Sequence, residues 1–203
     1  MNAIPLAQFL ILMAEVRVHV PVLLVTAVFS RYLDALEKAR DRLEQIYGPV
    51  QWSSSPFVFN QTTYYEASMG PDLRKQFFAF RDLVAPERLP DIKLRTNALE
   101  DEIAATRLYP EARPVNIDPG LLELGKFLLA TTKDQAHRVY LRDGISAEVT
   151  LRYHAGAFEP WPWTYADYRE PAVREFLRTA RDYYRGRLRE RDTASGEGDR
   201  CGT

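Results

Sequence analysis

An apolar run over residues 18–29 most constrains what this chain can fold into. The run is rich in valine and leucine and has little of the polar alternation that marks a strand with one solvated face. Strands buried on both faces have this continuous apolar character. The run therefore predicts a central strand, with other parts of the chain packed on both faces of its sheet.

The segments after this run predict alternating helices and strands. Ser30 is a candidate N-cap for the first helix, and Gly48-Pro49 is typical of its end. In chain order, the expected elements are a helix over residues 31–47, a broken strand over 50–59, a strand over 73–83, a helical region from 86 or 91 to 105, a short strand over 115–117 and a last helix over 171–189.

This order predicts an α+β fold, with one mainly antiparallel sheet and helices packed on it. The first six elements match a split βαβ, ferredoxin-like layout. We expect a single domain over residues 18–190, an N-terminal extension over 1–17 with Met13 as a second candidate start, and a disordered tail over 191–203, which lacks large apolar residues. The layout hosts many unrelated functions, so it predicts none.

The segment after Asn116 allows two interpretations. Asp118 is a good N-cap, and Pro119 would occupy the first helical position. We therefore expect a helix that ends near Ala130, with an apolar side made of Leu121, Leu122, Leu124, Phe127 and Leu128. A buried strand over residues 126–132 is the alternative.

A hairpin is the clearest local signal in the chain, since Arg142-Asp143-Gly144 separates two strand-like runs. A two-residue loop would place Arg142 opposite Ile145 and mix apolar and charged residues on each face. A three-residue loop separates them, so we favour it, because the buried face selects the register. The pairs then expected are Leu141 with Ile145, Val139 with Ala147 and His137 with Val149 on the apolar face, and Tyr140 with Ser146, Arg138 with Glu148 and Asp134 with Arg152 on the polar face.

The polar face of this hairpin and the segment before it hold the candidate functional residues. Lys133, Arg138 and Arg152 could donate hydrogen bonds to an anionic small molecule, such as a nucleotide or a phosphorylated metabolite. Glu148 could act as a base or orient the ligand, with His137 as a second candidate catalytic residue. The remaining candidate ligand-binding residues are Asn116, Asp118, Thr132 and Asp134.

The same face has a purely structural interpretation, in which cross-strand ion pairs stabilise a solvated sheet. Exposed pairs of this kind contribute only about 0–1 kcal/mol. Under the binding hypothesis, Arg138→Ala and Glu148→Gln should cost little stability and abolish binding. Under the structural one, the two residues should be strongly coupled in stability.

Charge and composition exclude several classes of protein. The net charge of −1 gives no electrostatic support for binding nucleic acid or an anionic membrane. The apolar N-terminus is too short to span a bilayer and lacks the features of a signal peptide. The single cysteine, Cys201, excludes an intramolecular disulfide and a cysteine metal site, which fits a cytoplasmic protein. No metal site is predicted, although His137 and His154 could meet Asp118 or Glu148 through the tertiary fold, and the sequence does not identify a cofactor.

An arginine-rich last helix provides an alternative function. Its arginines form a basic stripe on an otherwise neutral chain, which is typical of a solvated helix face or of a surface that binds RNA or an acidic partner. A non-catalytic interaction protein is therefore the alternative to a small-molecule site. The arginines are Arg174, Arg178, Arg181, Arg185, Arg187, Arg189 and Arg191.

Several ordered stretches carry a family resemblance: TTYYEASMG, IKLRTNALE, VNIDPG, ATTKD, HRVYL, AEVTLRY and WTYADYR. Together they resemble an uncharacterised bacterial domain-of-unknown-function family, from about Pro21 to Arg185. Ala166 stands where that family is expected to have proline. The resemblance implies no established activity, although some members carry an automatic GTP-binding label.

The residues do not support a conventional GTPase. No G-x-x-x-x-G-K-[ST] loop is present to cradle phosphates. Thr132-Lys133-Asp134 is similar to a guanine-reading Asn/Thr-Lys-x-Asp motif, but the spacer is missing. On an extended segment without that spacer, Lys133 and Asp134 point to opposite sides.

Overall fold

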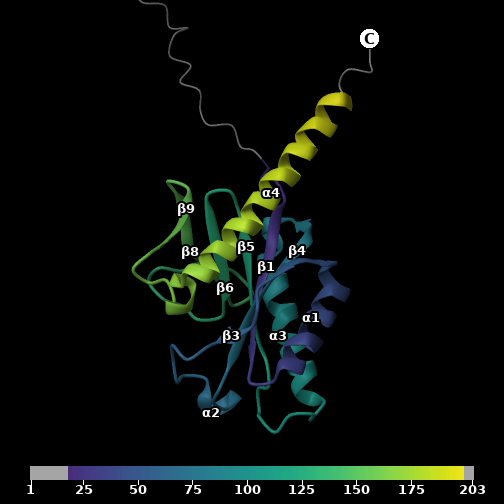
Figure 1. The fold of residues 1–203 in the computed structure, drawn as a ribbon. Coiled ribbons are helices and arrows are strands. Elements are labelled where there is room, and N and C mark those ends of the chain that lie inside the picture. Colours follow the sequence, from purple (N-terminus) through teal and green to yellow (C-terminus); the bar gives the residue numbers. More distant parts are fainter. Residues whose placement is uncertain (1–17, 199–203) are drawn as a thin grey trace, which may run out of the picture.

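The computed structural model describes residues 18–198, which form one antiparallel sheet with helices on both faces (Figure 1). The elements are β1 (Val22–Ser30), α1 (Leu33–Tyr47), β2 (Val50–Ser53), β3 (Phe57–Val58), α2 (Glu66–Met69), β4 (Arg74–Val84), η2 (Pro86–Arg88), α3 (Leu89–Ala105), β5 (Asn116–Leu122), β6 (Lys126–Thr131), β7 (Val139–Arg142), β8 (Ile145–His154), β9 (Ala157–Pro160), η3 (Ala166–Arg169) and α4 (Pro171–Gly198). The predicted α+β class is confirmed.

β1 is the central strand that the apolar run predicts. All nine of its residues are buried, and it pairs with β4 on one side and β5 on the other. The sheet order is β2-β4-β1-β5-β6-β8-β7. Its first four members, together with α1 and α3, have the strand order of a ferredoxin-like split βαβ layout, and the strands after β5 extend that sheet.

Side-chain alternation along β1 supplies a core on each face of the sheet. Val22, Leu24 and Val28 pack with α1 and α3, whereas Leu23, Val25 and Ala27 pack with α4. Figure 1 shows α4 crossing the sheet on the side opposite α1 and α3. Polar side chains of β1, β4 or β5 that point to the sheet face covered by α4 therefore lie under α4 or next to its N-terminal end.

Two local signals at Ser30 and Asp118 are wrong as helix caps. Ser30 ends β1, donates to the Pro114 carbonyl oxygen at 2.6 Å and makes no cap to α1. Asp118 lies inside β5, so the predicted helix ending near Ala130 is wrong and the alternative strand is confirmed as β6. The free edge of β1 explains the outcome, because pairing with β5 satisfies backbone groups that a helix would leave buried and unpaired.

The hairpin of β7 and β8 combines both predicted loops. Val139 pairs with Ala147 and Tyr140 with Ser146, as the three-residue loop predicts. Arg142, however, pairs with Ile145, because a bulge lies between Tyr140 and Arg142. Asp143 and Gly144 both have positive φ, which is typical of a two-residue type I′ turn. The predicted pair of Leu141 with Ile145 is therefore wrong, and all of β7 is exposed at the sheet edge.

The last helix is longer than predicted. α4 continues past Arg189 to Gly198, and Thr193 Oγ1 donates to the carbonyl oxygens of Arg189 and Glu190. The predicted disordered tail over residues 191–203 stays a prediction. Residues 199–203 and the predicted extension over 1–17 lie outside the described residues. No helix within residues 18–198 is both long and apolar enough to cross a membrane.

Candidate functional site

The candidate site lies where β5 and β6 separate. β6 pairs only with residues 120–122 of β5, so residues 116–119 pair with β1 alone. Pro119, the first β5 residue without a β6 partner, lacks the N–H that a ladder needs. An added Cβ at Gly120 would collide with the Leu128 carbonyl oxygen and the Phe127 ring. The two strands thus approach closely at Gly120 and diverge before it.

Two side chains of α3 satisfy the β5 backbone in this gap. Lys93 Nζ donates to the Ile117 carbonyl oxygen at 2.9 Å, and the Ile117 N–H donates to Glu100 Oε1 at 2.7 Å. Lys93 and Glu100 are seven residues apart and so share one helix face. Their charged groups make the hydrogen bonds to β5 that a neighbouring strand would otherwise make. The gap between β5 and β6 is therefore lined by polar groups and not by an apolar layer.

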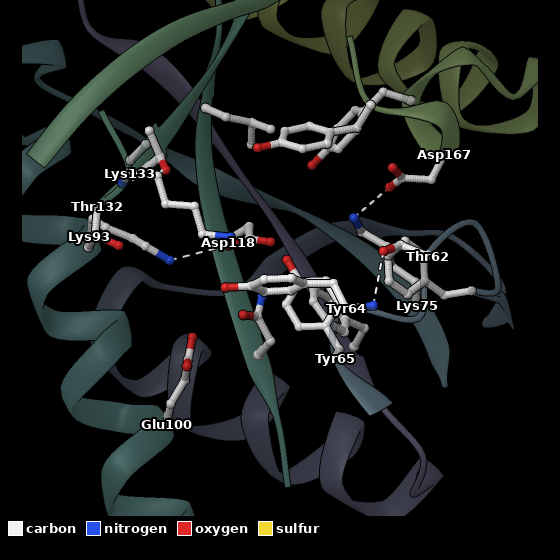
Figure 2. A pocket seen from close by; sticks show the side chains of 18 of the residues that line it. Thr62, Tyr64, Tyr65, Lys75, Lys93, Glu100, Asp118, Thr132, Lys133 and Asp167 are labelled. Carbon is white, nitrogen blue, oxygen red and sulfur yellow. Dashed lines mark hydrogen bonds and ion pairs between the residues drawn. The ribbon is translucent and has the colours of Figure 1, made fainter. Parts of the chain in front are cut away.

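A cavity of about 630 Å³ opens at this gap (Figure 2). Its wall combines aromatic rings, neutral polar groups and charges of both signs, supplied by β1, β4, β5, β6, β8, α3, η3 and the loop before α2. The lining residues include Tyr64, Tyr65, Lys75, Lys93, Asn97, Glu100, Asp101, Arg113, Asn116, Asp118, Lys133, Glu148, Asp167 and Tyr168.

Lys75 is a buried cation with one carboxylate partner. Its residue is 3% exposed, and Nζ donates to Asp167 Oδ2 at 2.5 Å. The ammonium also lies 4.8 to 5.6 Å from the ring centroids of Phe29, Phe59, Phe77 and Tyr168. Rings at this distance attract a cation through their quadrupoles. Asp167 and the rings together compensate for the solvation that Lys75 loses.

Asp118 lies between cations on the same cavity wall. Its Oδ1 accepts a hydrogen bond from Lys93 Nζ at 3.2 Å (Figure 2). Burial acts to raise the pKa of the Asp118 carboxyl, but Lys93, Lys75 and Arg113 outweigh burial and hold that pKa below its ordinary value. Asp118 is therefore ionised at neutral pH.

Arg113 and Glu100 form a second charged group beside Asn116. Glu100 Oε2 accepts from Arg113 Nε at 3.0 Å and from Nη2 at 2.6 Å, and Nη2 also donates to Asn116 Oδ1. The hydrogen bond from Arg113 orients the Asn116 amide so that its oxygen faces Arg113 and its nitrogen points away from Arg113. Among the described residues that nitrogen has no hydrogen-bond partner, and neither has the buried Tyr168 hydroxyl. Buried polar groups left unpaired cost about 1–3 kcal/mol each.

Glu100 predicts a pH dependence of stability. Burial raises the pKa of its carboxyl above the ordinary value of 4.5, although Lys93 and Arg113 act in the opposite direction. Its contribution to stability is therefore complete below the ordinary pKa and is lost as pH rises through the raised pKa. We expect the difference in free energy of unfolding between wild type and Glu100→Gln to fall as pH rises above about 4.5, as measured by urea unfolding.

Glu102, on the same helix, is the control of opposite sign. Hydrogen bonding from Arg95 lowers the pKa of the Glu102 carboxyl, so its contribution to stability is lost as pH falls. The difference between wild type and Glu102→Gln should therefore rise with pH. A difference for Glu100→Gln that also rises with pH, or stays constant, would contradict the assignment of burial as the dominant cause.

Lys133 lies at the cavity as a cation without a carboxylate. Its Nζ lies 4.0 Å from the centroid of the Tyr64 ring and makes no ion pair within residues 18–198. Tyr64 in turn meets the Tyr65 ring edge-on, with centroids 5.0 Å apart. Figure 2 shows Tyr64 and Tyr65 beside each other on the cavity wall. The Lys133 ammonium, which has no carboxylate partner, and the two tyrosine rings therefore form one part of the wall that a ligand can contact.

The predicted pair of Arg138 and Glu148 is confirmed, but it is buried and not solvated. Arg138 Nε donates to Glu148 Oε2 at 2.8 Å, and the two side chains are 2% and 1% exposed. Arg138 also donates to the Lys133 carbonyl oxygen at 2.9 Å and to the Tyr165 hydroxyl at 2.6 Å. Glu148 lines the cavity, whereas Arg138 lies behind Glu148 and donates its hydrogen bonds to other protein groups.

His137 has a different neighbour from the predicted Val149. Its Nε2 lies 3.2 Å from Glu148 Oε2, and its ring stacks on Trp163 with centroids 5.4 Å apart. The residues before β7 do not continue the ladder, so His137 turns toward Glu148 in place of the apolar face. His137 and Arg138 thus converge on one carboxylate oxygen, with His137 on its more exposed side.

The structure brings together part of the predicted set. Asn116, Asp118, Thr132, Lys133 and Glu148 line the cavity, with His137 and Arg138 directly behind Glu148. The predicted pair of Asp134 with Arg152 is wrong: Arg152 pairs with Lys126 across the β6–β8 ladder and binds Glu159 at 2.8 Å, and Asp134 is exposed outside the cavity. His154 also binds Glu159, and no group of residues within 18–198 has the arrangement of a metal site.

Sequence reasoning missed the cavity residues that come from other elements, namely Lys75, Lys93, Glu100, Arg113 and Asp167. One signal was available on α3, where Lys93, Asn97, Glu100 and Asp101 recur at helical intervals and form a polar stripe. A second was Lys75, a charged residue in phase with Phe77 and Ala79 on the inward face of β4.

The arginines of α4 are largely engaged by the protein itself. Arg178 binds Glu175 and Asp182, and Arg185 binds Asp182. Arg181 donates to the Leu124 carbonyl oxygen at 2.7 Å and covers the Tyr153 ring. These contacts are those of a solvated helix face, and binding of RNA or an acidic partner there stays a prediction.

The fold and the cavity define a single-domain α+β protein in which a ferredoxin-like half and added strands share one internal site. The chain belongs to the family described as Domain of unknown function (DUF4416), whose model matches residues 20–184. This match confirms the resemblance to a domain-of-unknown-function family. Neither the curated proteins nor the solved structures include a match to this chain.

Proposed function

We propose that the cavity binds a small organic anion, such as a nucleotide or a phosphorylated metabolite. The observation that carries the proposal is the pair of cations with unused donors on its wall. Lys133 makes no ion pair within residues 18–198, and Arg113 uses Nε and Nη2 but has no partner there for Nη1. An ammonium without a carboxylate partner and a guanidinium N–H without an acceptor favour a ligand with anionic oxygens.

The size and lining of the cavity support the same class of ligand. A volume of about 630 Å³ lies within the range of sites for small metabolites. Tyr64 and Tyr65 offer rings on which a base or sugar can stack. The unpaired Asn116 amide nitrogen would gain a partner from a ligand oxygen that reaches it. Lys133 keeps its predicted role, whereas Arg113 replaces Arg138 and Arg152 as the guanidinium donor.

Catalysis is a separate part of this proposal. Glu148 is a carboxylate on the cavity wall, and His137 connects it to a more exposed position. The two residues could accept and pass on a proton from a bound ligand. A cytoplasmic setting belongs to the same proposal, because phosphorylated metabolites are held inside cells, and a bacterial origin rests on the family resemblance alone.

Lys133→Ala tests the proposal without disturbing the fold. Lys133 makes no ion pair with the protein and only a cation–π contact with the exposed Tyr64 ring, so its loss should change the melting temperature little. It should weaken binding of an anionic ligand about tenfold. Calorimetry with inorganic phosphate, sugar phosphates and nucleoside monophosphates provides the measurement. Lys126→Ala is the matched control, because Lys126 binds Glu123 outside the cavity and should not affect affinity. Failure of every anion to bind wild type would reject the proposed function.

A further inference from the structure

Asp118 presents an unused hydrogen-bond acceptor to the cavity. Its Oδ1 is bound by Lys93, while Oδ2 has no hydrogen-bond partner within residues 18–198. The side chain is 27% exposed, whereas that of Lys93 is 6% exposed. Figure 2 shows Asp118 on the cavity wall between Lys93 and the Tyr64 and Tyr65 rings. A ligand therefore meets a carboxylate oxygen here, although cations surround it.

This acceptor restricts which anions fit. An ionised carboxylate can only accept hydrogen bonds, so an anionic oxygen placed against Oδ2 would be repelled. The ligand must bring a hydrogen-bond donor to Asp118 while its anionic group reaches Arg113 and Lys133. A phosphate ester whose organic part has no hydroxyl lacks a donor that is separate from its anionic group.

The neighbours of Asp118 decide between a neutral and a charged donor. Lys93 binds the same carboxylate, and Lys75 and Arg113 also act on it electrostatically. A ligand ammonium group would meet these cations at close range, with the like-charge repulsion that such a contact carries. A hydroxyl group donates its hydrogen bond without this repulsion. Neutral polar side chains on the same wall, namely Gln61, Thr62, Asn97, Thr131 and Thr132, suit further hydroxyls.

We propose that the ligand is a hydroxyl-bearing organic phosphate, such as a sugar or polyol phosphate, and that Asp118 selects it by accepting a hydrogen bond from one of its hydroxyls. This inference rests on the proposed function, since Arg113 and Lys133 hold the phosphate. Asp118 is thereby the residue that determines specificity, and the cations determine only that the ligand is an anion.

Calorimetry with matched phosphate esters tests the inference. Ribose 5-phosphate and glycerol 3-phosphate carry hydroxyls, and propyl phosphate is glycerol 3-phosphate without them. We expect wild type to bind at least one hydroxylated ester about tenfold or more tighter than propyl phosphate. Asp118→Asn should lose this preference and bind propyl phosphate more tightly than wild type does, because a repulsive charge is removed. A merely structural role for Asp118 would leave the preference for hydroxylated esters unchanged in Asp118→Asn.

Asp101→Asn is the matched control, since Asp101 lines the same cavity, is exposed and has no ion-pair partner within residues 18–198. It should keep the preference for hydroxylated esters. Equal affinity of wild type for propyl phosphate and the hydroxylated esters would overturn the inference while leaving the proposed function standing, as would a preference that survives in Asp118→Asn. If no ester and no inorganic phosphate binds wild type, both proposals fail. Should Asp118→Asn not fold, the comparison of esters on wild type decides alone.

Discussion

Asp167→Asn is expected to destabilise the protein by about 3–5 kcal/mol, because it leaves the buried Lys75 ammonium without a counterion. Lys75 is paired with Asp167 at 2.5 Å, and both side chains are 4% exposed. The surrounding rings cannot replace the carboxylate, since a cation–π contact contributes only about 0.5–2 kcal/mol. For a domain of this size the loss corresponds to a fall in melting temperature of roughly 10 °C, measurable by thermal and urea unfolding.

Two further variants separate this cause from a general effect of changing Asp167. Lys75→Met in the Asp167→Asn background should recover much of the lost stability, because it removes the unpaired charge and keeps the apolar stem. Asp34→Asn, which breaks the exposed pair with Lys38, should change the melting temperature little. A single variant at Asp167 as stable as wild type, or a double variant less stable than the single one, would contradict the role assigned to the pair.

The sequence predicted the fold where patterns were long. The apolar run of β1 is a long pattern that does not depend on any single residue, since every position from Val22 to Ser30 is buried. The helices and strands after it could be recognised in order along the chain. Prediction failed at Asp118-Pro119, where a short capping signal and a leucine-rich segment also fit a helix. The missing information was tertiary: β1 has two edges, and β5 is required on the second one. The residues around Asp118 do not by themselves show that this segment must pair with β1.

The candidate site was predicted only along one stretch of chain. The candidate residues between Asn116 and Glu148 are close in sequence, so their clustering was visible, and five of these candidates line the cavity. Their partners come from far away, as with Lys75 and Asp167, which are 92 residues apart. Burial also changes the role expected for Arg138. The sequence suggests that its guanidinium donates hydrogen bonds to an anion, but in the structure the guanidinium donates to Glu148, Tyr165 and the backbone.

Because Arg138 and Glu148 are buried together, mutating either residue should also cause a large loss of stability. The binding hypothesis predicts that Arg138→Ala and Glu148→Gln cost little stability, but both side chains of the pair are almost fully buried. Glu148→Gln should destabilise by about 3–5 kcal/mol, because Arg138 loses the carboxylate that compensates for its burial. Arg138→Met should cost a similar amount by leaving Glu148 with only His137 and Thr150.

A double-mutant cycle measures the interaction directly. The combined variant, Arg138→Met with Glu148→Gln, should be much less destabilised than the sum of the two single variants, with a coupling energy of about 2–3 kcal/mol from urea unfolding. The matched cycle at Arg152 and Glu159, an exposed pair on β8 and β9 with a comparable distance of 2.8 Å, should show no measurable coupling. Equal coupling in the two cycles would mean that burial does not govern the pair. Strong coupling at Arg138 alone would show why this guanidinium holds Glu148 on the cavity wall and leaves ligand binding to Arg113 and Lys133.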